Sequence, residues 1–295
     1  MSTLLSRAYL LRKMLGFGIV LAAIALVIQL LWQRVGLGGP AVNGALAGGL
    51  VAAAATALGT IPVLLSQRLS ERTQDTLFGF GAGVMLAASA FSLVVPGIAA
   101  AQSQGAGPWQ AGMTVGASIL LGAALLLLLD RVLPHEHFIK GVEGPQALAL
   151  RRAWLFVFAI ALHNLPEGLA IGVAFAGTDP TSAGALATGI AIQDLPEGLV
   201  VAAALLAVGY SRLLSVGLGM ASGLVEPVGA VFGAAVVSHS AALLPWGLGF
   251  AAGAMLFVIS HEIIPESHRK GHEVYATGGL MVGFVIMMVL DTALG

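Results

Sequence analysis

The chain of 295 residues contains no cysteine, and only 9% of its residues carry a charged side chain. The absence of cysteine excludes disulfides, thiolate catalysis and sulfur-rich metal sites. A soluble domain usually has about 25% charged residues, so a chain this poor in charge cannot cover a water-facing surface. The 13 Lys and Arg are balanced by 14 Asp and Glu, which leaves no basic patch for a nucleic acid. The composition therefore excludes soluble globular proteins, disordered chains and nucleic-acid binders.

Hydrophobic residues, in contrast, make up 58% of the chain, and glycine alone contributes 40 residues. Small residues let helices approach closely in lipid, and a spanning helix needs about 20 predominantly apolar residues. The alternating segments typical of outer-membrane barrels are not found. We therefore predict an all-α polytopic membrane protein. The apolar runs that predict its helices are 14–33, 41–66, 76–100, 110–133, 153–176, 182–208, 213–238, 241–264 and 274–294.

Positive charges predict the orientation of these spans, because cytoplasmic loops carry an excess of Lys and Arg. With this span assignment, every Lys and Arg except Arg34 falls on the side of the N-terminus. We therefore expect a cytoplasmic N-terminus and an extracytoplasmic C-terminus. The longest connection, 134–152, is predicted to be a solvated cytoplasmic loop containing His135 and His137. A bacterial inner membrane is the simplest location for a chain without a large extramembrane domain.

Two segments, 162–169 and 192–199, share the sequence Leu-Pro-Glu-Gly and lie at the centres of consecutive predicted spans. Consecutive spans run antiparallel, so both motifs are expected near the midplane of the membrane. An ionised carboxylate at that depth costs at least ~3 kcal/mol, so Glu167 and Glu197 indicate a functional site. The motif prolines lack an N–H and free a carbonyl, which is tolerated where the carbonyl faces protein or a wet cavity.

Further polar residues accompany the two glutamates. His163 precedes Glu167 by four residues and Gln193 precedes Glu197 by four, so each pair shares a helix face. The next span adds Glu226, which stands directly before a proline.

Four acidic residues of these spans are expected to lie close together within the membrane: Glu167, Asp194, Glu197 and Glu226. Four carboxylates gathered in one place cannot all ionise without a counter-charge. Two divalent cations would neutralise them and displace protons on binding. A set of imidazole and oxygen donors suits Zn²⁺, and also Fe²⁺, Mn²⁺ or Cd²⁺.

The two motifs resemble those of the ZIP (Zrt-, Irt-like) family of divalent metal transporters. The resemblance rests on His163-Asn164-x-Pro166-Glu167-Gly168 and Gln193-Asp194-x-Pro196-Glu197-Gly198. It extends over the eight runs from about residue 41 to the end of the chain. It implies eight core helices in a 3+2+3 inverted-repeat arrangement within 41–295, in which one helix bundle moves against another. Residues 1–40 would then form a cytoplasmic tail and one additional transmembrane helix. The long His-rich loop of many members is short here.

The resemblance also implies a binuclear metal site within the transport path. The first metal position would use His163, Glu167, Gln193 and Glu197. The second would use Asn164, Glu167, Asp194, Glu197 and Glu226. Met85, in the middle of run 76–100, fits either a further ligand or simple packing. Asn164 and Gln193 fit either metal ligation or hydrogen bonds between helices.

Polar residues near the ends of the spans provide secondary candidates. A cytoplasmic exit path would use Asp130, His261, Glu262 and His272. Asp291, near the extracytoplasmic end of the last span, would attract incoming cations. Solvation of helix ends explains these residues equally well.

We therefore predict a transporter, not an enzyme, which moves divalent metal ions, chiefly Zn²⁺, toward the cytoplasm. An intramembrane metal-dependent hydrolase is one alternative, but its usual His-Glu-x-x-His sequence is absent. A non-transporting metal sensor is another. The predicted partners are metal ions and the lipid bilayer. Faces rich in Gly and Ala fit a homodimer interface as well as internal packing. Metal preference, proton coupling and the choice between channel-like and carrier-like transport are left open by the sequence.

Overall fold

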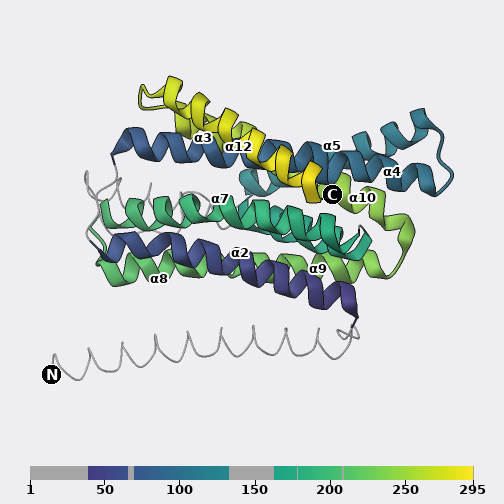
Figure 1. The fold of residues 1–295 in the computed structure, drawn as a ribbon, viewed down its shortest axis with the longest axis horizontal. Coiled ribbons are helices and arrows are strands. Elements are labelled where there is room, and N and C mark those ends of the chain that lie inside the picture. The colour runs from purple at the N-terminus through teal and green to yellow at the C-terminus, as the bar shows by residue number, and fades with distance from the viewer. Residues whose placement is uncertain (1–38, 66–69, 133–162, 178, 208, 295) are drawn as a thin grey trace. The chain divides into compact units, whose positions relative to one another are not determined.

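The computed structural model describes residues 39–65, 70–132, 163–177, 179–207 and 209–294. Within these ranges, every regular element is a helix, and the long helices run roughly along one direction (Figure 1). The predicted run 14–33, the start of run 153–176, and His135 and His137 lie outside the described residues.

Seven described helical stretches are long and apolar enough to cross a membrane. They are Pro40–Leu64, Glu71–Ser103, Pro108–Leu128, Pro180–Ala207, Arg212–Ser238, Ala241–His268 and Glu273–Ala293. A further helix occupies 163–177 and carries the first motif. The prediction of an all-α polytopic membrane protein is confirmed. Four of the stretches correspond to the uninterrupted helices α2 (Pro40–Leu64), α5 (Pro108–Val132), α7 (Pro180–Ala207) and α12 (Glu273–Leu294).

Two predicted spans contain a π-helical segment. One consists of α3 (Glu71–Ala87), the π-helix η1 (Ala88–Val94) and α4 (Val95–Ser103). The other consists of the short 3₁₀ helix η2 (Ala241–Leu243), α10 (Leu244–Val258), the π-helix η3 (Ile259–Ile263) and α11 (Ile264–His268). A proline, Pro96 or Pro265, follows each π segment and removes one backbone N–H from the helical ladder. π segments frequently occur at functional sites.

The run 213–238 is not one continuous helix. It consists of α8 (Arg212–Ser222) and α9 (Val225–Ser238), separated at Gly223 and Leu224. Pro227 stands in the first turn of α9, where a missing N–H is tolerated. The break places Glu226 in that same first turn, whereas the sequence pattern predicted a helix that continued past it.

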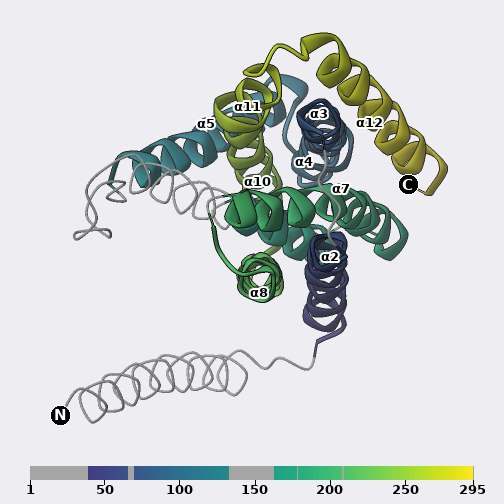
Figure 2. The ribbon, with the colours of Figure 1, turned by 90° about the vertical axis from the view of Figure 1, so that its left-hand side faces the viewer.

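α7 lies centrally and contacts α3, α8 and α12 (Figure 2). It begins at Pro180, directly after Asp179, whose carboxylate accepts hydrogen bonds from the backbone N–H of Thr181 at 2.8 Å and of Ser182 at 3.0 Å. The bond from the Ser182 hydroxyl, together with these two, lowers the pKa of Asp179 to about 2. This N-terminal cap fixes where the second motif helix starts.

Glycines allow the outer helices to pack backbone to backbone. α3 contacts α12, and α5 contacts α10. A Cβ atom on Gly83 of α3 would lie 1.9 Å from the carbonyl oxygen of Leu280, and one on Gly253 of α10 would lie 2.0 Å from that of Ile119. Such close contacts, typical of helix association in lipid, leave no room for a larger side chain.

The glycine of each motif makes a matching contact. A Cβ atom on Gly198 would lie 2.0 Å from the carbonyl oxygen of Thr56 in α2, and one on Gly168 would lie 2.3 Å from that of Glu226 in α9. The two motif helices are therefore each pressed against a neighbouring helix at the level of their glutamates.

The outer surface is apolar, as a lipid-facing surface requires. Trp109 is 89% exposed and Val274 is 80% exposed, and many exposed Leu, Val and Ile accompany them. Alanine and glycine are common in the interior, and six of the sixteen polar or charged residues that are buried in the described part of the chain belong to the two motifs.

Candidate metal centre

Three carboxylates from the two motif helices converge in the interior. Oxygens of Glu167, Asp194 and Glu197 all lie within 4.8 Å of one another, and all three side chains are buried. Glu167 comes from the helix at 163–177, and Asp194 and Glu197 come from α7. Pro196 lies between the α7 carboxylates and cannot donate a hydrogen bond to the carbonyl of Ile192. Both motifs thus supply oxygen atoms at one depth, as the sequence predicts.

Gln193 connects the carboxylates of the two helices. Its Nε2 donates a short hydrogen bond to Glu167 Oε1 and a second one, at 3.2 Å, to Asp194 Oδ1. The amide therefore partly offsets the repulsion between these two buried carboxylates. It also orients the glutamate so that Oε2 is its free oxygen.

A second polar group forms at the break between α8 and α9. The side-chain amide of Asn164 donates to the carbonyl oxygen of Ser222 at 3.0 Å and to Glu226 Oε1 at 3.2 Å. The hydroxyl of Thr56 in α2 lies 3.0 Å from the same Glu226 oxygen. The end of α8 leaves carbonyl groups without helical partners, and Asn164 binds one of them. The break and the first motif are thus joined through one side chain.

His163 is directed toward the π segment η3. Its Nε2 lies 2.8 Å from Oε2 of Glu262, and the histidine ring is buried. The other ring nitrogen, Nδ1, is buried and has no hydrogen-bond partner within the described residues. The structure thus links a predicted ligand of the centre to a residue predicted for the exit path.

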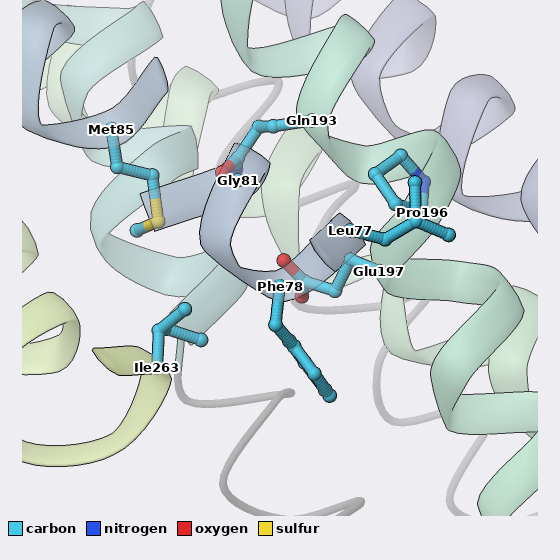
Figure 3. A pocket seen from close by; sticks show the side chains of 8 residues that line it. All are labelled: Leu77, Phe78, Gly81, Met85, Gln193, Pro196, Glu197 and Ile263. Carbon is cyan, nitrogen blue, oxygen red and sulfur yellow. The ribbon is translucent and has the colours of Figure 1, made fainter. Parts of the chain in front are cut away.

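Met85 lies beside the second motif. A cavity of about 10 Å³, which is close to the space one water molecule needs, is lined by Met85, Gln193 and Glu197 together with Gly81, Pro196 and Ile263. Figure 3 shows these side chains around the cavity, with Met85 on α3 and Glu197 on α7. This position beside the cavity fits the predicted role of Met85 as a ligand and fits packing equally well.

Most of the predicted ligands share one further property. Among the described residues, nine buried polar side-chain atoms have no hydrogen-bond partner; three of them belong to Asp75, Ser89 and Ser215, and the other six belong to predicted ligands. These atoms are His163 Nδ1, Asn164 Oδ1, Glu167 Oε2, Asp194 Oδ2, Glu197 Oε1 and Glu226 Oε2. An unpaired buried polar atom costs about 1–3 kcal/mol, so six of them on predicted ligands need a physical explanation. Within the described residues, the close group is made of Glu167, Asp194 and Glu197, and His163 and Glu226 lie outside it. Five oxygens and one imidazole nitrogen are the donors that Zn²⁺ and similar cations accept.

The secondary candidates have individual partners. Asp291 Oδ1 accepts a hydrogen bond from the hydroxyl of Ser92 in the π segment η1, at 2.5 Å. His272 Nδ1 lies 2.8 Å from Oδ2 of Asp75, which is completely buried in α3. The ring of His261 stacks on Phe257 with centroids 4.9 Å apart. The side chain of Asp130 lies outside the described part of the structure.

Three groups contact the predicted ligands but were not predicted from the sequence. They are the hydroxyl of Thr56, the backbone carbonyl of Ser222, and Glu262 as a partner of His163. Glycine at 223 and proline at 227 are the sequence signal for the break that exposes the Ser222 carbonyl. The other two contacts join residues at least 99 positions apart, and nothing local in the sequence indicates them.

The fold and the site define a class of protein: a polytopic helical membrane protein with a buried group of carboxylates on its two motif helices. The family description "ZIP Zinc transporter" matches residues 140–291. The chain belongs to the ZIP zinc transporter family, as its motifs predict.

Individual relatives agree with this assignment. The chain is 51% identical over 252 residues to zinc transporter ZIPB of Bordetella bronchiseptica, which covers 85% of this chain and 81% of that one. It is 48% identical over 246 residues to zinc transporter GufA of Myxococcus xanthus, covering 83% and 97%. Human zinc transporter ZIP11 is 32% identical over 321 residues, covering 81% and 94%. These names support a transporter and not the metal-dependent hydrolase considered as an alternative.

Proposed function

We propose that this chain transports Zn²⁺ across the membrane toward the cytoplasm, through a site for two metal ions at the midplane. The observation that carries the proposal is that six of the nine buried polar side-chain atoms without hydrogen-bond partners among the described residues belong to predicted ligands. Relatives of the chain that are named zinc transporters support Zn²⁺ as the transported ion.

The first metal position would be built from His163, Glu167, Gln193 and Glu197. A neutral imidazole offers a metal only one nitrogen lone pair. Since Nε2 of His163 is bonded to Glu262, Nδ1 is the nitrogen that is free to bind. Met85 would add a soft donor at the edge of this position, next to the small cavity.

The second position would be built from Asn164, Asp194 and Glu226, with Glu167 and Glu197 shared between the two. Its donors are oxygens only. Harder cations such as Mn²⁺ and Fe²⁺ accept such a set as readily as Zn²⁺ does, and Cd²⁺ fits the softer first position with Met85 better. Shared carboxylates would hold the two ions close together and neutralise the buried negative charge.

The route would continue on both sides of the centre. Asp291 would attract cations at the extracytoplasmic end. Asp130, His261, Glu262 and His272 would accept them on the cytoplasmic side. The charge asymmetry of the loops supports this orientation and an inner-membrane location in a bacterium.

The fold offers a way to move the ions. In the proposed 3+2+3 arrangement of 41–295, the two motif helices would move with one bundle against the other. The exposed apolar faces of α5 and α12 would face lipid or a second copy of the chain in a homodimer.

The proposal is tested by zinc flux into sealed proteoliposomes that contain a zinc-sensitive dye. The parent should transport zinc, and Glu167→Ala should abolish the flux because Glu167 serves both metal positions. Glu273→Ala, an exposed glutamate at the start of α12, is the matched control and should transport as the parent does. Excess Cd²⁺, Fe²⁺ or Mn²⁺ outside the vesicles should reduce the zinc signal if these ions use the same site. A parent signal no larger than that of empty vesicles would refute the proposal.

A further inference from the structure

Thr56 in α2 is fully buried beside the proposed centre. Its hydroxyl oxygen lies 3.0 Å from Glu226 Oε1 and 3.3 Å from the carbonyl oxygen of Ala52 in its own helix. A hydroxyl has one hydrogen to donate. A Glu226 carboxylate that binds a metal ion is ionised, and hydrogen bonds to ionised acceptors are roughly twice as strong as neutral ones. Oε1 of Glu226 is also the nearer of the two acceptors. The hydroxyl of Thr56 therefore donates to Glu226.

The two oxygens of Glu226 have different surroundings. Oε1 accepts from two donors, Thr56 at 3.0 Å and Asn164 at 3.2 Å. Oε2 is buried and has no partner within the described residues. Two donors from different helices converge on one oxygen and fix the plane of the carboxylate. The fixed plane determines where the free oxygen points.

The backbone around Thr56 fixes the hydroxyl in turn. A Cβ atom on Gly198 of α7 would lie 2.0 Å from the carbonyl oxygen of Thr56, and one on Gly223 would lie 2.9 Å from its Cβ. Thr56 is thus enclosed between the second motif and the break before α9. Neither neighbour leaves space for the residue to shift.

We propose that Thr56 is a positioning residue for the second metal position: its hydroxyl holds Oε1 of Glu226 so that Oε2 faces the bound ion. This inference rests on the proposed binuclear site. Thr56 does not touch the metal. The ligands unique to the first position are held by other groups, since His163 bonds Glu262 and Gln193 bonds Glu167. Loss of the Thr56 hydroxyl therefore weakens binding of the ion at the second position and leaves binding at the first position unchanged.

The test is zinc binding to the purified full chain, measured by equilibrium dialysis from a metal-free start. The parent should bind two zinc ions. Thr56→Val keeps the shape of the side chain and removes the hydroxyl. It should lower the affinity for the second zinc ion about 10- to 100-fold, which is the range found when a hydrogen-bond partner of a metal ligand is lost. The first ion should bind as in the parent. Thr56→Ser should restore binding of the second zinc ion, because serine keeps the hydroxyl. The smaller Thr56→Ala should bind zinc as Thr56→Val does.

Thr60→Val is the matched control. Thr60 lies one turn further along α2, is equally buried, and donates to the carbonyl oxygen of Ala57 in its own helix at 2.7 Å. This variant should bind both ions as the parent does, and its melting temperature without zinc should match that of Thr56→Val.

Three results would overturn the inference. In the first, Thr56→Val binds both zinc ions as the parent does. In the second, its affinity for both ions falls equally. In the third, Thr56→Ser fails to restore binding of the second ion. A parent that binds no second zinc would instead contradict the binuclear site itself, and the inference with it.

Discussion

Nε2 of His163 lies 2.8 Å from Oε2 of Glu262, so the first motif is bonded to the π segment η3. An ionised carboxylate only accepts hydrogen bonds, so Nε2 carries the hydrogen of this bond. In the neutral ring, Nδ1 then carries the lone pair, and it is the nitrogen without a partner among the described residues. A histidine that binds metal through one nitrogen and a carboxylate through the other is a common arrangement in metal sites. In the proposed site, the bond to Glu262 would leave Nδ1 of His163 available to a metal ion.

Replacing Glu262 tests this relationship. Glu262→Gln removes the charge that holds the histidine, and it should weaken zinc binding at the first position about 10- to 100-fold. Competition with a zinc-binding dye measures the affinity. Glu266→Gln, which alters an exposed ion pair with Arg269 one turn later, should have no effect. Tighter binding by Glu262→Gln would mean that Glu262 competes with zinc for His163.

The motif glycine of α7 is expected to be intolerant of any side chain. In Gly198→Ala the new Cβ would lie 2.0 Å from the carbonyl oxygen of Thr56, so α2 and α7 must separate. Overpacking of this kind costs about 1–3 kcal/mol, and the melting temperature in detergent should fall. Gly184→Ala is the control, because a Cβ at that position of α7 meets nothing within 4 Å. Equal melting temperatures for the two variants would show that the close contact is not needed.

Asp291 is expected to act through its charge. Asp291→Asn should reduce zinc flux at low zinc concentration and leave the maximal rate nearly unchanged, because a carboxylate near the entrance raises the local cation concentration. The difference from the parent should shrink as ionic strength rises, since salt screens exposed charges. Flux measured at two salt concentrations decides this. A lower maximal rate at saturating zinc would instead place Asp291 among the residues that handle the ion directly.

The sequence predicts much of this molecule because its strongest signals are local. Long apolar runs identify the spans, and a repeated Leu-Pro-Glu-Gly identifies the centre. The pairing of Glu167 with Asp194 and Glu197 follows from two consecutive antiparallel helices, and the structure brings these three carboxylates together.

Other features depend on contacts between distant helices. The apolar pattern of 213–238 continues through the break at Gly223, because both pieces face the same surroundings. The sequence around Thr56 is that of an ordinary apolar helix, and its hydrogen bond to Glu226 of α9 becomes visible only in the structure. Likewise, His272 was predicted for an exit path from its position alone, whereas the structure pairs it with buried Asp75.

The most direct test of the account is to locate zinc in the protein. Crystals of the full chain soaked in zinc should give two peaks in anomalous difference maps recorded at the zinc edge. One peak should lie among His163, Glu167, Gln193 and Glu197, and the other among Asn164, Asp194 and Glu226. Zinc bound only elsewhere, for example between Asp75 and His272, with no peak at the central carboxylates, would contradict the account.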